Sequence, residues 1–231
     1  MIHNIILKVS GKLKTIYLKL FIYMLPFILI VIPINFYLQT YKGNFFLKTL
    51  FILLDFLIID FVFIIGLFKI KELIVSNDNN SNIFLEISVN IYNLLKIIVK
   101  KVILSYGLMY VFFIGLYFMI KWFLAYPIYI FENIDNPFPK SEKLVKNNSF
   151  KIFLLLLLMF IVPFIAFLLM FPFIKQFDYF GLNRRTVIII IGGFLTIILF
   201  PIYILINYEA YTYLKENYIE IIDLPKLKKI Q

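Results

Sequence analysis

Five long apolar runs dominate this sequence, and each is long enough to cross a lipid bilayer. They cover residues 15–38, 45–68, 102–131, 151–174 and 186–210. A membrane-spanning helix needs about 20 predominantly apolar residues. Because 63% of the residues are hydrophobic and only 16% are charged, the chain could not cover its apolar surface in water. The sequence therefore predicts an all-α, polytopic integral membrane helical bundle with five to six membrane segments, forming a single domain over residues 1–231.

Two further segments have helical periodicity but are too polar to span a membrane. In residues 1–14, Ile2, Ile5, Ile6 and Val9 share one face of a helix, with lysines opposite. This segment is either an amphipathic helix lying on the membrane surface or a frayed start of the first span. Residues 82–101 are predicted to form an interfacial helix whose apolar stripe is made of Phe84, Ile87, Ile91, Leu94, Leu95 and Ile98.

The third apolar run is too long for a simple crossing. As one helix, residues 102–131 would measure about 45 Å at 1.5 Å per residue, whereas the hydrocarbon core of a bilayer is about 30 Å thick. The segment must therefore be long and kinked, with Pro127 as the predicted break, or it must turn back as a helical hairpin.

The distribution of basic residues bears on this choice, because cytoplasmic loops carry an excess of lysine and arginine. Five passes would place twelve basic residues on one side of the membrane and eleven on the other. A hairpin within the third run would give seventeen against six, the six being Lys42, Lys48, Lys121, Lys175, Arg184 and Arg185. Charge thus favours an even number of passes, with both termini cytoplasmic, while segment length favours five. The chain is expected in the cell membrane with a cytoplasmic N-terminus.

The basic excess, a net charge of +10, is expected to meet anionic lipid headgroups of the bilayer rather than nucleic acid, since the cations lie between apolar runs. The sequence has no cysteine, which excludes disulfides and thiolate chemistry. Its one histidine, His3, cannot build a metal or acid–base site alone, and neither H-E-x-x-H nor a phosphate-binding glycine loop occurs. The sequence therefore predicts no cofactor and a protein that is not an enzyme.

Two carboxylates lie inside the second apolar run, at Asp55 and Asp60. An ionisable group deep in a membrane costs a few kcal/mol or more and is a functional hypothesis by default. Five residues apart, the two side chains point about 140° apart on a helix and do not form a dyad. The alternative is that each is a structural hydrogen-bonding group facing a neighbouring span.

The third run ends in charged residues that have two interpretations. Lys121 precedes Trp122, a combination typical of anchoring at the membrane interface. Alternatively, Lys121 pairs with an acid such as Glu132 or Glu209. Glu132 is about 16 Å further along a straight helix, so direct pairing would require the break at Pro127.

Residues 121–132, which read K-W-F-L-A-Y-P-I-Y-I-F-E, and the basic connector after them follow a recognisable pattern. The pattern is a basic residue, Ala-x-Pro, a glutamate and Ser-x-x-Leu-x-Lys, matched by Lys121, Ala125, Pro127, Glu132, Ser141, Leu144 and Lys146. It resembles the membrane region of membrane-anchored glycerophosphodiester phosphodiesterases and related uncharacterised multi-pass membrane proteins. Asn147 or Asn148 stands where that pattern usually has glycine. The resemblance implies an α-helical membrane domain but no phosphodiesterase activity, because the catalytic domain of those enzymes has no counterpart here.

Two functions remain open from the sequence. The first is a non-catalytic scaffold or accessory membrane domain that binds a membrane protein partner. The second is a small transporter or lipid-handling protein that uses Asp55 or Asp60 within the bundle. Accessible water beside Asp55 or Asp60 would favour the second function, and a dry, filled bundle would favour the first.

Overall fold

The computed structural model describes residues 1–40, 43–75, 83–110, 112–177 and 184–227. Within these ranges the chain is helical almost throughout and contains no strand, which confirms the predicted all-α fold. Among the described residues, five helical segments are long and apolar enough to cross a membrane. They are Thr15–Ile34, Phe46–Ile74, Phe113–Glu132, Phe138–Leu169 and Ile191–Tyr218.

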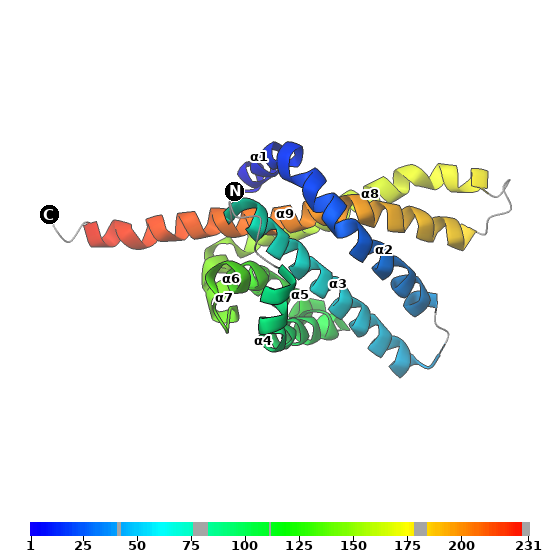
Figure 1. Ribbon diagram of the computed structural model, residues 1–231, viewed down its shortest axis with the longest axis horizontal. Coiled ribbons are helices and arrows are strands. Elements are labelled where there is room, and N and C mark those ends of the chain that lie inside the picture. Colours follow the sequence, from blue (N-terminus) through cyan, green and yellow to red (C-terminus); the bar gives the residue numbers. More distant parts are fainter. Residues whose placement is uncertain (41–42, 76–82, 111, 178–183, 228–231) are drawn as a thin grey trace.

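The helices form two long antiparallel pairs with shorter helices packed at one end (Figure 1). In chain order they are α1 (Ile2–Lys12), α2 (Leu18–Thr40), α3 (Phe45–Val75), α4 (Ile83–Ser105), α5 (Phe112–Lys121), α6 (Ala125–Glu132), α7 (Phe138–Val145), α8 (Ser149–Phe177) and α9 (Arg184–Leu227). The α2–α3 pair and the α8–α9 pair diverge toward the right of Figure 1. The N-terminus, α6, α7 and the C-terminal half of α9 lie toward the opposite end.

Helix α1 packs against the protein rather than lying free on a surface. Its residues Ile5 and Val9 are buried, and α1 lies along α9. Ile6, predicted on the same apolar face, is 42% exposed. A π-helical turn at Leu13–Tyr17 then joins α1 to α2. Burial of only two aliphatic side chains makes α1 a small element that depends on α9 for its position.

Helix α4 is amphipathic as predicted, but its buried stripe is rotated from the predicted one. Ile87, Leu94 and Ile98 are buried, whereas Ile91 and Leu95 are almost half exposed. Helix α4 packs against both α3 and α5. Its inward side therefore includes four further residues, Ile83, Ile97, Lys101 and Val102. Two packing partners give a broader inward face than one interface would.

The third apolar run is interrupted twice. After α4 ends, a 3-10 turn at Gly107–Tyr110 reverses the chain, and α5 packs back against α4. The Lys100 Nζ consequently lies 5.5 Å from the centre of the Trp122 ring. In a continuous helix these two residues would be about 33 Å apart. The chain therefore reverses direction between α4 and α5 and does not continue as one straight helix.

The second interruption lies at residues 122–124, and the prediction that Pro127 breaks the helix is wrong. The Ala125 backbone N–H donates to the Trp122 carbonyl at 3.1 Å, a tight turn between α5 and α6. Pro127 lies in the first turn of α6, where a backbone N–H would lack a partner within the helix. The absence of a backbone N–H in Pro127 therefore costs no helical hydrogen bond at this position.

The main hydrophobic core is centred on α3, α6 and α9, with α1, α2, α4 and α8 around it. Residues 125–130 of α6 are all buried. Helices α2, α3 and α9 approach closely at Gly66, where the side chains of Met24 and Ile204 occupy the space beside the missing Cβ. A separate small cluster of Val187 and Ile191 joins α9 to α8 farther out. The α8–α9 pair thus meets the bundle along only part of its length.

Candidate functional site

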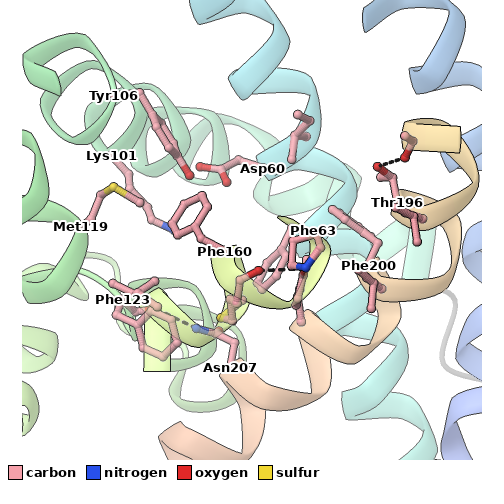
Figure 2. A pocket seen from close by; sticks show the side chains of 18 of the residues that line it. Asp60, Phe63, Lys101, Tyr106, Met119, Phe123, Phe160, Thr196, Phe200 and Asn207 are labelled. Atoms are coloured by element: carbon pink, nitrogen blue, oxygen red, sulfur yellow. Dashed lines mark hydrogen bonds between the residues drawn. The ribbon is translucent and has the colours of Figure 1, made fainter. Parts of the chain in front are cut away.

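A cavity of about 500 Å³ lies between α3, α4, α5, α8 and α9 (Figure 2). Its wall is mostly apolar and aromatic, with Phe63, Phe123, Phe160 and Phe200 among the lining side chains. This volume lies within the range of small-molecule binding sites, about 300–1,000 Å³. The bundle is therefore hollow where one of its membrane carboxylates is located.

Asp60 on α3 is the carboxylate that lines the cavity, and it is 5% exposed. The Tyr126 hydroxyl, from the first turn of α6, donates a short hydrogen bond to Asp60 Oδ2. Tyr106, which follows α4, points its hydroxyl toward the same carboxylate (Figure 2). Three elements that are far apart in sequence therefore meet around Asp60, and the reversal between α4 and α5 brings two of them there.

Lys101 on α4 supplies the cation of the site. Its Nζ lies 3.7 Å from the centre of the Tyr126 ring, the ring whose hydroxyl binds Asp60. The negative face of the aromatic ring stabilises the ammonium group. Lys101 and Asp60 both line the cavity, so its polar side carries one positive and one negative group in contact with a single tyrosine.

Asn207 on α9 adds an unused hydrogen-bond acceptor. Its side chain is 3% exposed, and its Nδ2 donates to the Phe123 carbonyl at 2.9 Å, at the interruption between α5 and α6. Its Oδ1 is buried and has no hydrogen-bond partner among the described residues. A buried amide oxygen without a donor costs about 1–3 kcal/mol. Asn207 itself is one of the residues that line the cavity.

The cavity opens toward the outer surface of the α8–α9 pair. Two of its lining residues, Phe160 on α8 and Thr196 on α9, are exposed, Phe160 by 61%. The neighbouring surface is strongly apolar: Phe164 on α8 is 61% exposed and Phe194 on α9 is 58% exposed. In a membrane, lipid chains would cover this surface. The exposed lining residues therefore lie on a side of the cavity that lipid chains would contact.

Asp55, the other membrane carboxylate, does not take part in this site. It is 9% exposed and is not among the residues that line the cavity. Its Oδ1 is buried and finds no hydrogen-bond donor in the described ranges. The two aspartates thus serve different surroundings, as expected from their angular separation on α3.

The predicted charged residues of the 121–132 segment form structural contacts elsewhere. Glu132 accepts hydrogen bonds from Lys140 Nζ, from Tyr211 Oη at 2.8 Å and from Lys215 Nζ at 3.1 Å, which joins α6, α7 and α9. Glu209, 1% exposed, forms an ion pair with Lys12 of α1.

Lys121 pairs with neither of these acids in the described structure. Its Nζ lies 5.4 Å from the Tyr117 ring, whose residue is 53% exposed. This position agrees with the interpretation of Lys121 as an interfacial anchor.

Ser141 has a clear structural role. Its side chain is fully buried, its hydroxyl donates to the Lys121 carbonyl at 2.7 Å, and it accepts a hydrogen bond from the Leu124 N–H at 3.3 Å. These are backbone groups left without helical partners at the interruption between α5 and α6. Nearby, Trp122 Nε1 donates to Glu142 Oε1 at 2.9 Å. The serine of the sequence pattern therefore fixes α7 against the interruption.

Four members of the site were not among the predicted residues: Lys101, Tyr106, Tyr126 and Asn207. Lys101 left a signal, because it stands four residues after Ile97 and three after Ile98, and so falls on the apolar stripe of its helix. A cation on such a stripe needs a partner. Asn207 also stands out as a polar residue within an apolar span. Tyr126 left no comparable signal among the many tyrosines of this chain.

In the part of the chain that the structure describes, no group of three histidine, cysteine, aspartate or glutamate side chains could hold a metal ion. Comparisons of the chain with protein-family models, with curated proteins and with solved structures give no match. The resemblance to the membrane region of glycerophosphodiester phosphodiesterases therefore stays a prediction from the residues of the 121–146 segment.

Proposed function

We propose that this protein is a lipid-handling membrane protein that binds an amphiphile in the cavity beside Asp60. The single observation that carries the proposal is the cavity itself, about 500 Å³ with an apolar aromatic wall and a polar group at one side. A scaffold would gain packing energy from a filled bundle, since protein interiors are close-packed. An apolar chain in the cavity would restore those contacts while its head meets Asp60 and Lys101.

The route of entry supports a ligand taken from the membrane rather than from water. The exposed lining residues Phe160 and Thr196 lie on the outer surface of two long apolar helices. A lipid could enter there without leaving an apolar environment. The protein would act by binding and moving this molecule, not by catalysis.

Filling the cavity should abolish binding. Gly192 on α9 lines the cavity, and a Cβ added there would meet no atom within 4 Å, so the side chain of Gly192→Leu would begin in open space. We expect at least about tenfold weaker binding, equivalent to 1.4 kcal/mol. The measurement is the affinity of the purified protein in nanodiscs for a pyrene-labelled fatty alcohol.

The matched control is Gly11→Leu on α1. Gly11 is also helical, also has open space around its Cβ position and lies away from the cavity. Both substitutions raise helix propensity by about 1 kcal/mol, so neither should lower the unfolding temperature. Equal affinity in Gly192→Leu and Gly11→Leu, or no binding by the unaltered protein, would overturn the proposal.

We propose in addition that both termini lie on the cytoplasmic side of the cell membrane. The antiparallel packing of α4 and α5 supports an even number of passes, and lysines of α1, α7 and α9 gather at one end of the bundle. Such clustering is typical of a cytoplasmic face.

This orientation predicts a pattern of chemical labelling, which is convenient because the chain has no cysteine. Single cysteines at the exposed positions His3 and Lys143 should react with a membrane-impermeant maleimide only in inverted vesicles. A cysteine at Lys48, exposed near the start of α3, should react only in intact cells. Labelling of positions 3 and 143 from opposite sides would exclude the even-pass arrangement.

A further inference from the structure

The polar side of the cavity restricts which amphiphile it can bind. Four groups line it, from α3, from α4 and the turn after α4, and from α9: the Asp60 carboxylate, the Lys101 ammonium, the Tyr106 hydroxyl and the Asn207 amide (Figure 2). The two charges balance, and both contact Tyr126. Ligand specificity must therefore come from this combination of one anion, one cation and one free acceptor.

A charged head would meet an unfavourable partner in either case. An anionic head would approach Lys101 beside the Asp60 carboxylate, because both groups contact Tyr126. A cationic head could approach Asp60 only beside Lys101. Like charges held close together in a region of low dielectric constant repel strongly, because little solvent screens them. A head without net charge avoids both penalties.

A hydrogen-bond donor on the head is required for a different reason. Asn207 Oδ1 is buried and lacks a donor in the described structure, while its amide nitrogen is already bonded to the Phe123 carbonyl. Tyr126 occupies one oxygen of Asp60. A hydroxyl group can donate to one of these acceptors and accept from Lys101 at the same time. An ether or ester oxygen alone can only accept.

The volume limits the apolar part. A methylene group occupies about as much space as a water molecule, roughly 30 Å³, so a 500 Å³ cavity holds about 17 such groups. That is enough for one long hydrocarbon chain. The lateral opening at Phe160 and Thr196 admits a chain lengthwise from the lipid phase.

We propose that the ligand is a single-chain lipid with an uncharged, hydroxyl-bearing head, such as a long-chain alcohol or a monoacylglycerol. This inference rests on the proposed function, because it assigns the head and chain of the molecule in the same cavity. The hydroxyl lies between Asn207, Asp60 and Lys101, and the chain fills the aromatic part of the cavity toward Gly192.

Four probes with the same chain test the inference: oleyl alcohol, oleyl methyl ether, oleyl sulfate and oleylamine. Their ability to displace the pyrene-labelled fatty alcohol from the full-length protein in nanodiscs is compared. We expect oleyl alcohol to bind at least about tenfold more tightly than each of the others. The ether tests the donor, and the sulfate and amine test the two charges.

Two variants should redirect the preference in opposite directions. Asp60→Asn keeps an acceptor for Tyr126 but leaves Lys101 as the only charge, so oleyl sulfate should become the tightest of the four. Lys101→Met leaves Asp60 as the only charge, so oleylamine should become the tightest. The comparison of the four probes uses the unaltered protein. The head-group assignment can therefore be tested even if one of the variants fails to fold.

The outcomes separate this inference from the proposed function. If all four probes compete equally, or if the sulfate or amine binds best to the unaltered protein, the head-group assignment is wrong while an amphiphile site remains. If the labelled alcohol does not bind and no probe associates with the protein, both proposals fail. A tenfold preference for the alcohol that is lost in Asp60→Asn and Lys101→Met supports the assignment.

Discussion

Gly66→Leu is expected to prevent stable assembly of the bundle. At this position α2, α3 and α9 approach so closely that even a Cβ would overlap with Ile204 Cδ1 and would lie 3.3 Å from Met24 Sδ. Both neighbouring side chains are fully buried. Overpacking of a core typically costs 1–3 kcal/mol, and a leucine at this three-helix contact should cost at least about 3 kcal/mol. That is a large part of the total stability of a typical domain, about 5–15 kcal/mol.

Thermal unfolding in mild detergent, followed by size-exclusion chromatography, measures this effect. Gly11→Leu is the matched control, because it makes the same chemical change at a helical glycine with open space around it. The milder pair Gly66→Ala and Gly66→Ala/Ile204→Val tests the cause: removing Cδ1 of residue 204 should recover most of the loss. An unfolding temperature of Gly66→Leu equal to that of the unaltered protein would mean that the three helices do not meet at Gly66.

Lys12→Met should release α1 from the bundle. The Lys12 ammonium forms an ion pair with Glu209, whose side chain is 2% exposed, and lies 4.8 Å from the centre of the Tyr208 ring. Without the cation, a buried carboxylate on α9 has lost its charged partner. Breaking a buried pair in this way costs about 3–5 kcal/mol. Because Lys12 is itself 32% exposed, we expect about 2–3 kcal/mol here.

The loss should appear as a lower unfolding temperature and as faster proteolysis within residues 1–17. Lys8→Met is the control on the same helix. Both side chains of the Lys8–Glu216 pair are exposed, so this pair should contribute under about 1 kcal/mol to the free energy of unfolding. The double variant Lys12→Met/Glu209→Leu should recover much of the stability, because no charge is then left buried. If the double variant is less stable than Lys12→Met alone, the unpaired carboxylate is not the source of the loss.

Apolar run length and helical periodicity were enough to predict the all-α membrane class and the positions of the long helices, but not that α3 continues to Val75 and α9 to Leu227. They could not predict where the third run is interrupted. Pro127 is the residue whose chemistry most clearly opposes a helix, yet it lies in a first turn where that chemistry has no effect. The observed interruption at residues 122–124 depends on Ser141, which lies on another helix and binds the backbone groups that the interruption exposes.

The candidate site was predictable only in part for the same reason. Asp60 was identified because an ionisable group in an apolar run is conspicuous in any sequence. Its partners come from α4 and α6, and only the reversal of the chain after α4 brings Lys101 and Tyr126 to the same carboxylate. Conversely, Glu132 and Glu209 were marked as candidates by their charge, but lysines from α1, α7 and α9 neutralise them in structural contacts.

The contacts that helix α9 makes limit how the cavity could change shape. Within five residues it presents Asn207 to the cavity, Glu209 to α1 and Tyr211 to Glu132 at the end of α6. These contacts point in different directions around one helical axis, so rotation or sliding of α9 would disrupt them together. Helix α8 has fewer such constraints: in its outer half Phe164, Leu168 and Leu169 are all at least half exposed. Of these two walls, α8 could therefore shift with the smaller loss of polar contacts, although Tyr203 of α9 donates a hydrogen bond to the Met159 carbonyl of α8.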